Sequence, residues 1–198
     1  MTVDISSIKR LKDLTGVGLT DAKKALEESS GDFDKALESM RKKGLTKADK
    51  RSEREARAGL IGTYNHDGRI GVLVEVNCET DFVARNEIFV NLVKDISMHI
   101  AASNPEFLSI TDVATDVKLK VRNDFLEKSR AEGKPENMLD KIVDGQVDKY
   151  FKEKCLLDQP FVKNPDQTVG EYIKEHNARL GENILVRRFS RMVLGEVN

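Results

Sequence analysis

Cysteine is scarce in this sequence of 198 residues, which has no tryptophan and only four prolines. The two cysteines, Cys78 and Cys155, are too few for a disulfide framework and lack the spacing of metal ligands. We therefore expect a reducing, cytoplasmic compartment. No stretch approaches about 20 uninterrupted apolar residues, which argues against a membrane protein. The first residues show neither a basic nor an apolar leader region, so we expect no secretion signal.

The sequence also lacks an excess of charge of either sign. It contains 33 lysines and arginines against 34 aspartates and glutamates, for a formal net charge of -1. A dedicated nucleic-acid-binding protein usually carries a basic excess, so this balance argues against that class. A heavily charged but balanced surface is typical of a soluble protein that contacts other proteins. The length fits about one domain, or one domain and a small module.

Motifs of catalysis and cofactor binding are missing as well. No phosphate-binding P-loop is present, and Gly16-x-Gly18 lacks the third glycine of a dinucleotide-binding fingerprint. Cys78 ends a predicted strand with no base nearby in the sequence, which favours a small buried residue over a reactive thiol. The histidines are scattered and form no ligand cluster: His66, His99 and His176. We therefore expect no metal site, no cofactor and no enzymatic activity.

Apolar residues at helical spacing predict three short helices near the N-terminus. Thr20 is the expected N-cap of the second helix, and Asp32 is that of the third. Each helix is too short to be stable alone, so the three must pack together in a domain over residues 1–44. The predicted helices span residues 4–14, 21–29 and 33–43.

Residues 45–57 are mostly charged and have no apolar stripe, which predicts a solvated linker. From Gly59 the period changes to that of strands, and Asp67-Gly68 is a strong hairpin signal. Asn86 is the expected cap of the helix that follows. The predicted elements are strands over 60–65 and 69–77 and a helix over 87–102.

The C-terminal half predicts more helices and a last strand. Gly145 is the expected end of the second of these helices, and a capping box from Thr168 to Glu171 opens the third. The predicted fold class is α+β, with an N-terminal three-helix domain, a linker, and a core over 58–198 in which a small antiparallel sheet packs against helices. The remaining elements are helices over 111–132, 135–144 and 168–180, an irregular extended piece over 156–162, and a strand over 183–194.

One loop is a candidate for function. Thr80, Asp81, Phe82 and Val83 lie between a predicted strand and a predicted helix, where functional residues are common. An aromatic side chain at such a corner is usually part of the core. Beside an acidic residue it is also a good anchor for the pocket of a partner protein. The residues alone leave both interpretations open.

These residues carry a resemblance to a known family. Residues 8–26 read IKRLKDLTGVGLTDAKKAL, and residues 71–84 read GVLVEVNCETDFVA. Both resemble signatures of the bacterial elongation factor Ts family, as do residues 159–162 (QPFV) and the segment near Arg188-Phe189. The resemblance covers essentially the whole chain, and it implies a ubiquitin-associated-like domain at the N-terminus.

The resemblance implies a guanine-nucleotide exchange factor that binds elongation factor Tu. It implies that the Asp81-Phe82 loop inserts into the partner and disturbs its Mg²⁺ and phosphate site, so that GDP leaves and GTP can bind. The length resembles the short form of the family, which implies a homodimer. It also implies docking of the N-terminal domain on the partner through residues around one turn: Leu11, Gly16, Gly18, Leu19 and Thr20.

Two other classes stay open at this stage. One is a ubiquitin-associated-type binding module on an unrelated scaffold, which would capture a different partner. The other is a protein associated with RNA or the ribosome, whose binding would be sensitive to salt. Arg187, Arg188 and Arg191 are only weak support for this second class, because the overall charge is close to neutral.

Overall fold

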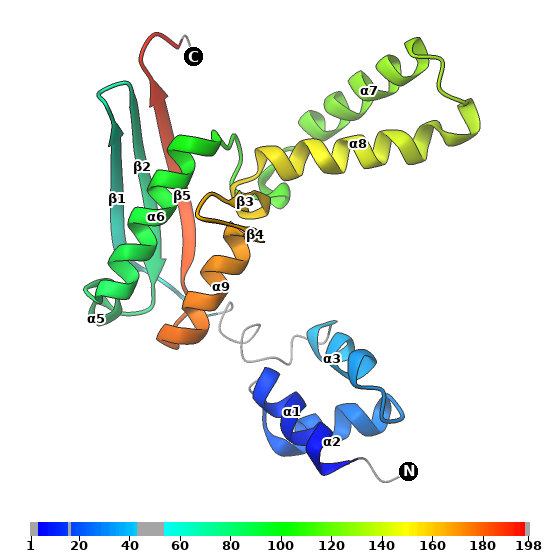
Figure 1. The fold of residues 1–198 in the computed structure, drawn as a ribbon, viewed down its shortest axis with the longest axis vertical. Coiled ribbons are helices and arrows are strands. Elements are labelled where there is room, and N and C mark those ends of the chain that lie inside the picture. Colours follow the sequence, from blue (N-terminus) through cyan, green and yellow to red (C-terminus); the bar gives the residue numbers. More distant parts are fainter. Residues whose placement is uncertain (1–3, 16, 43–53, 197–198) are drawn as a thin grey trace.

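Three helices near the N-terminus pack into a small bundle (Figure 1). The computed structural model of the protein describes residues 4–15, 17–42 and 54–196. The helices are α1 (Ile5–Thr15), α2 (Leu19–Glu28) and α3 (Phe33–Lys42). Their shared core contains buried residues from all three helices, among them Ile8, Leu11, Leu26 and Met40.

The bundle confirms the predicted helices and corrects one cap. Asp32 caps α3 as expected, because its Oδ1 accepts a hydrogen bond from the Lys35 amide. The predicted cap Thr20 is wrong, because α2 begins at Leu19, two residues before the predicted start. Gly18 is its N-cap instead, in an extended conformation, and the Gly18 carbonyl accepts the first helical hydrogen bond from Ala22. Most of the predicted linker, residues 45–53, lies outside the described residues.

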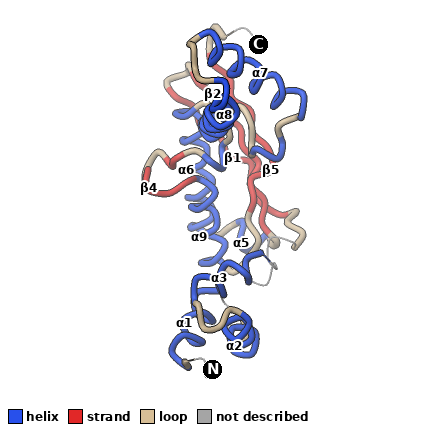
Figure 2. The backbone as a smooth tube through the Cα atoms, turned by 90° about the vertical axis from the view of Figure 1, so that its right-hand side faces the viewer, coloured by secondary structure: helices blue, strands red, loops and turns tan. Residues whose placement is uncertain are grey.

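A three-stranded antiparallel sheet forms the centre of the larger part of the chain. Its strands are β1 (Ala58–His66), β2 (Ile70–Cys78) and β5 (Leu185–Val193), in the order β1-β2-β5. Asp67 and Gly68 both have positive φ in the turn between β1 and β2, which confirms the hairpin signal. Figure 2 shows helices α6 (Glu87–Ser103) and α9 (Val169–Leu180) on one side of the sheet.

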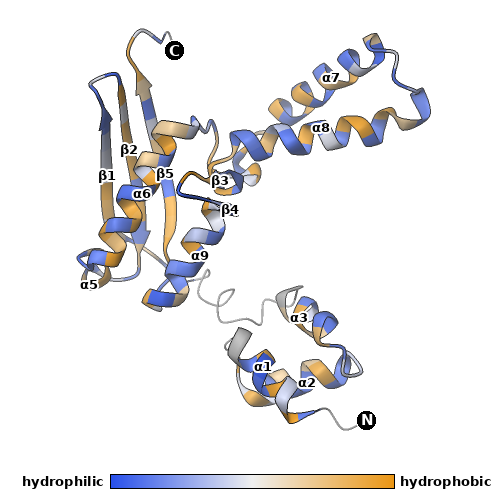
Figure 3. Ribbon diagram, viewed as in Figure 1, coloured by the Kyte–Doolittle hydropathy of each residue, from blue (hydrophilic) through white to orange (hydrophobic). Residues whose placement is uncertain are grey.

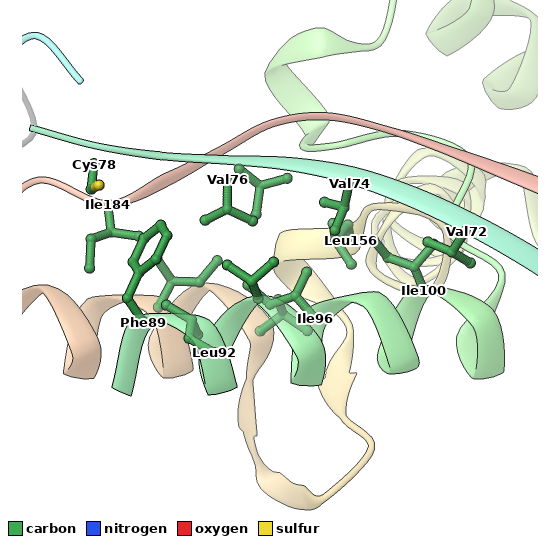
Figure 4. Close-up of a cluster of buried hydrophobic side chains, with 14 of the residues drawn as sticks. Val72, Val74, Val76, Cys78, Phe89, Leu92, Ile96, Ile100, Leu156 and Ile184 are labelled. Atoms are coloured by element: carbon green, nitrogen blue, oxygen red, sulfur yellow. The ribbon is translucent and has the colours of Figure 1, made fainter. Parts of the chain in front are cut away.

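The core lies between β2 and α6 (Figure 4). Alternate residues of β2 from Val72 to Cys78 point towards the helix, which is the predicted alternation. The Asn86 side chain caps α6 by accepting a hydrogen bond from the Ile88 amide, as expected. The helix contributes one buried face, which includes Phe89, Val93, Ile96 and Ile100.

A helical hairpin projects from the sheet (Figure 1). It consists of α7 (Thr115–Ala131) and α8 (Leu139–Lys154), and apolar residues alternate with polar ones along both helices (Figure 3). The predicted end of the second helix at Gly145 is wrong. Gly145 is exposed in the middle of α8, and the packing of Val143 and Phe151 on either side of it keeps the helix continuous. A mid-helix glycine costs only about 1 kcal/mol, so this packing outweighs it.

Short elements connect the hairpin to α9. The predicted extended piece is a single 3₁₀ turn followed by a small β-hairpin. The capping box of Thr168 and Glu171 is present, and Gly181 ends α9 with φ of 77°, so both predictions for this helix are confirmed. The other short elements are η1 (Ile110–Asp112), η2 (Glu136–Met138), η3 (Leu156–Asp158), β3 (Pro160–Phe161) and β4 (Asn164–Thr168).

His99 connects α6 to this region from a fully buried position. Its Nδ1 accepts a hydrogen bond from the Val162 amide at 3.2 Å, so the ring proton lies on Nε2 and is donated to Gln159 Oε1 at 2.9 Å. The Gln159 amide group in turn donates to the carbonyls of Ser103 and Glu153. Burial lowers the pKa of His99. His99 is therefore a structural residue, with both ring nitrogens hydrogen-bonded within the chain.

We expect this burial to make the protein less stable in mild acid. A histidine whose folded-state pKa lies below the unfolded value of about 6.5 takes up its proton preferentially when the chain unfolds. The free energy of unfolding should therefore fall as the pH is lowered from 7.5 to 5.5. Urea titrations at several pH values measure it. His99→Gln should flatten this slope, and an equal slope in the variant and in the unaltered protein would contradict the assignment.

No helix in the described part of the chain is both long enough and apolar enough to cross a membrane.

Candidate functional site

The candidate loop forms a single turn of helix between β2 and α6. This turn is α5 (Asp81–Ala84), and Thr80 is its N-cap. The Thr80 hydroxyl oxygen accepts a hydrogen bond from the Val83 amide at 3.3 Å. Val83 and Ala84 are buried in the core, so the inner side of the turn is anchored. The outer side, which carries Asp81 and Phe82, is left to the solvent.

Phe82 is the most exposed large apolar side chain among those described, at 79%. Asp81 beside it is also exposed and forms an ion pair with Arg85 at 3.1 Å. The interpretation of Phe82 as part of the core is therefore wrong. We refer to the exposed pair Asp81 and Phe82 as the tip. The use of the tip as an anchor in a partner's pocket stays a prediction, and the exposure of Phe82 supports it.

The backbone before the tip is held by two glutamates, one within this loop and one about a hundred residues later in the chain. Glu182 accepts hydrogen bonds from the amides of Glu79 and Thr80, and Glu79 accepts one from the Asn183 amide. Sequence reasoning missed both glutamates. About a hundred residues separate the two segments, and no local pattern indicates that a carboxylate at one will meet the backbone of the other.

Cys78 lies directly beneath this loop and is fully buried. Its thiol donates a hydrogen bond to the Thr80 carbonyl at 3.1 Å. Burial raises the pKa of Cys78 to about 11, and burial likewise raises the pKa of Cys155 to about 11. Both thiols therefore stay protonated near neutral pH, as expected for small packing residues rather than reactive ones.

The docking candidates of the N-terminal bundle divide into two groups. Gly18, Leu19 and Thr20 are exposed at the start of α2, and Leu19 has 53% of its surface accessible. Leu11 is fully buried in the bundle core, so its side chain supports the bundle and cannot face a partner directly. This corrects its place among the candidate contact residues. Gly16 lies outside the described residues.

Within the described ranges, no group of three or more histidine, cysteine or acidic side chains is arranged to hold a metal ion. The site therefore consists of an exposed aromatic tip on an anchored turn, without a cluster of chemically reactive groups. Such an arrangement is suited to contact with another protein.

Comparison with known proteins identifies the family. The family model described as "Elongation factor TS" matches residues 11–196. Elongation factor Ts of Geobacter sulfurreducens is 48% identical over 197 residues, which cover 99% of this chain and 91% of the relative. Elongation factor Ts of Thermodesulfovibrio yellowstonii is also 48% identical over 197 residues, covering 99% and 98% of the two chains. The chain therefore belongs to the elongation factor Ts family.

Proposed function

We propose that this protein is a translation elongation factor that promotes guanine-nucleotide exchange on elongation factor Tu in the cytoplasm. Family membership supports the class of activity. The observation that carries the proposal is the tip, because an aromatic ring with 79% of its surface exposed on an anchored turn has little role within its own chain. The protein makes and breaks no covalent bonds in this proposal, so we assign it neither a cofactor nor a metal.

The proposed mechanism is insertion of the tip between helices of the partner. Phe82 supplies apolar surface for a pocket, and Asp81 adds negative charge beside it. Insertion disturbs the partner's Mg²⁺ and phosphate site, so that GDP leaves and GTP can replace it. The coupling is negative and reciprocal: the factor weakens nucleotide binding by the same free energy by which nucleotide weakens binding of the factor.

Release of labelled GDP from elongation factor Tu tests this proposal directly. The 198-residue chain should accelerate release, and the acceleration should saturate as its concentration rises. A release rate that does not change at any concentration of the chain would refute the proposed activity.

We also propose that residues 1–44 form a separable docking module. Leu19 and Thr20 are exposed beside each other at the start of α2, where they are accessible to a partner. Deletion of residues 1–44 should weaken binding to elongation factor Tu by about tenfold or more, as loss of a contact surface does. Titration calorimetry measures this, with Leu19→Ala as the point variant. Equal affinities of the shortened and full-length chains would contradict the docking role.

The protein is further proposed to act as a homodimer through its core. The face of the sheet opposite α6 exposes Ile61 and Leu73 on adjacent strands and Met192 on β5. An exposed apolar sheet face is a suitable surface for a second copy of the chain. Sedimentation at micromolar concentration should show twice the 22.3 kDa mass of one chain. A single species with the mass of one chain would contradict the dimer.

A further inference from the structure

Glu182 lies in the short connection between α9 and β5, immediately after the left-handed Gly181 that ends the helix. Its carboxylate accepts three hydrogen bonds from two consecutive residues far away in the sequence. Oε2 accepts from the amides of Glu79 and Thr80, both at 3.1 Å, and Oε1 accepts from the Thr80 hydroxyl at 2.6 Å. Hydrogen bonds to an ionised acceptor are about twice as strong as neutral ones.

The contact is reciprocal. Glu79 Oε1 accepts a hydrogen bond from the Asn183 amide at 2.6 Å, and Arg54 lies 3.5 Å from the same carboxylate. The Asn183 side chain donates to the Arg54 carbonyl at 2.7 Å, which attaches the end of the predicted linker to the same place. Each segment thus presents a carboxylate to the backbone of the other. We call the pair Glu79 and Glu182 the carboxylate latch.

The Thr80 hydroxyl transmits this constraint to the tip. It donates its proton to Glu182 and accepts the hydrogen bond from the Val83 amide, so its orientation is fixed on both sides. The amide of Val83 belongs to α5, the turn that carries Phe82. Burial of Val83 and Ala84 anchors the other side of the turn. The direction in which the Phe82 side chain leaves the backbone is therefore set, although 79% of that side chain is exposed to solvent.

We propose that Glu182 is a positioning residue for nucleotide exchange, which fixes the first turn of α5 so that Phe82 is held ready for insertion. This inference rests on the proposed function. A ring that is already ordered loses less conformational freedom on binding than a mobile one. Loss of the latch should therefore weaken the action of Phe82 without removing the ring itself.

The absence of tryptophan from the chain allows a direct measurement of tip mobility. Phe82→Trp introduces a single tryptophan, whose time-resolved fluorescence anisotropy reports the motion of the ring. Glutamine is nearly the same size as glutamate, but Glu182→Gln removes the charge and places an amide N–H group where the carboxylate accepts hydrogen bonds from Glu79 and Thr80. We expect the residual anisotropy of Trp to fall in the variant that carries both changes. Glu175→Gln, which removes a charge from the exposed side of α9, is the control and should leave it unchanged.

The same substitutions in otherwise unaltered protein test the effect on exchange. Glu182→Gln should lower the maximal rate of GDP release from elongation factor Tu by about tenfold. In a Phe82→Ala background it should have no further effect, because there is no ring left to position. Thr80→Val breaks the link from its other side and should behave like Glu182→Gln, which keeps the proposal testable if one variant does not fold.

The two measurements separate the inference from the proposed function. An unchanged anisotropy would overturn the positioning role. A mobile ring combined with a normal maximal rate of GDP release would also overturn it. So would a Glu182→Gln substitution that lowers this rate equally in the presence and absence of Phe82. If the unaltered chain does not accelerate GDP release, the proposed exchange activity is refuted along with the role of Glu182 in it. The anisotropy would still decide whether the latch fixes the tip.

Discussion

Phe82→Ala is expected to slow the stimulated release of GDP from elongation factor Tu by about 30-fold, which corresponds to about 2 kcal/mol. The free energy of unfolding should hardly change. The side chain is 79% exposed, so its removal takes away few packing contacts within the chain. In the proposed complex the same ring is buried in a pocket, where aromatic residues are often responsible for much of the binding energy.

Paired measurements of the melting temperature and of GDP release test this expectation. Leu119→Ala is the matched control, because Leu119 is also a large exposed apolar residue but lies on α7 of the projecting hairpin. Its release rate should equal that of the unaltered protein. A large fall in the melting temperature of Phe82→Ala, with exchange preserved per folded molecule, would show that the ring acts in folding rather than in exchange.

Those parts of the fold that depend on local chemistry could be predicted from the sequence. Period-two alternation and the Asp67-Gly68 turn predicted the hairpin of β1 and β2, and the capping box at Thr168 predicted the start of α9. Gly145 shows the limit of such signals. A glycine favours a helix end locally, but the tertiary packing of α8 on α7 keeps the helix continuous.

The candidate site could be predicted only in part, for a related reason. The sequence indicated the Thr80–Val83 loop, but its pattern could not decide whether Phe82 pointed inwards or outwards. The error for Leu11 is in the opposite direction. Leu11 lies within a motif that resembles the family, and it was expected at the contact surface, but it is buried in the bundle. Glu182 was missed because its role depends on meeting Thr80, which the order of residues along the chain does not reveal.

The largest expected loss of stability is that of Phe89→Ala, at about 3–5 kcal/mol. Phe89 lies in the first turn of α6, only seven residues after Phe82, and is fully buried. Its ring packs in the cluster that includes Val76 and Ile184 between the helix and the sheet (Figure 4). Removing it leaves a cavity that the packed strands and helix cannot fill completely, so the transfer and cavity terms add.

Urea unfolding of Phe89→Ala beside Phe82→Ala measures the contrast. The same chemical change at two sites close together in the sequence should remove much of the stability at one and almost none at the other. GDP release, corrected for the folded fraction, should show the reverse order, with the smaller loss for Phe89→Ala. Phe89 is assigned here to the packing of α6 on the sheet, and Phe82 to contact with a partner. Equal free energies of unfolding for the two variants would contradict this assignment.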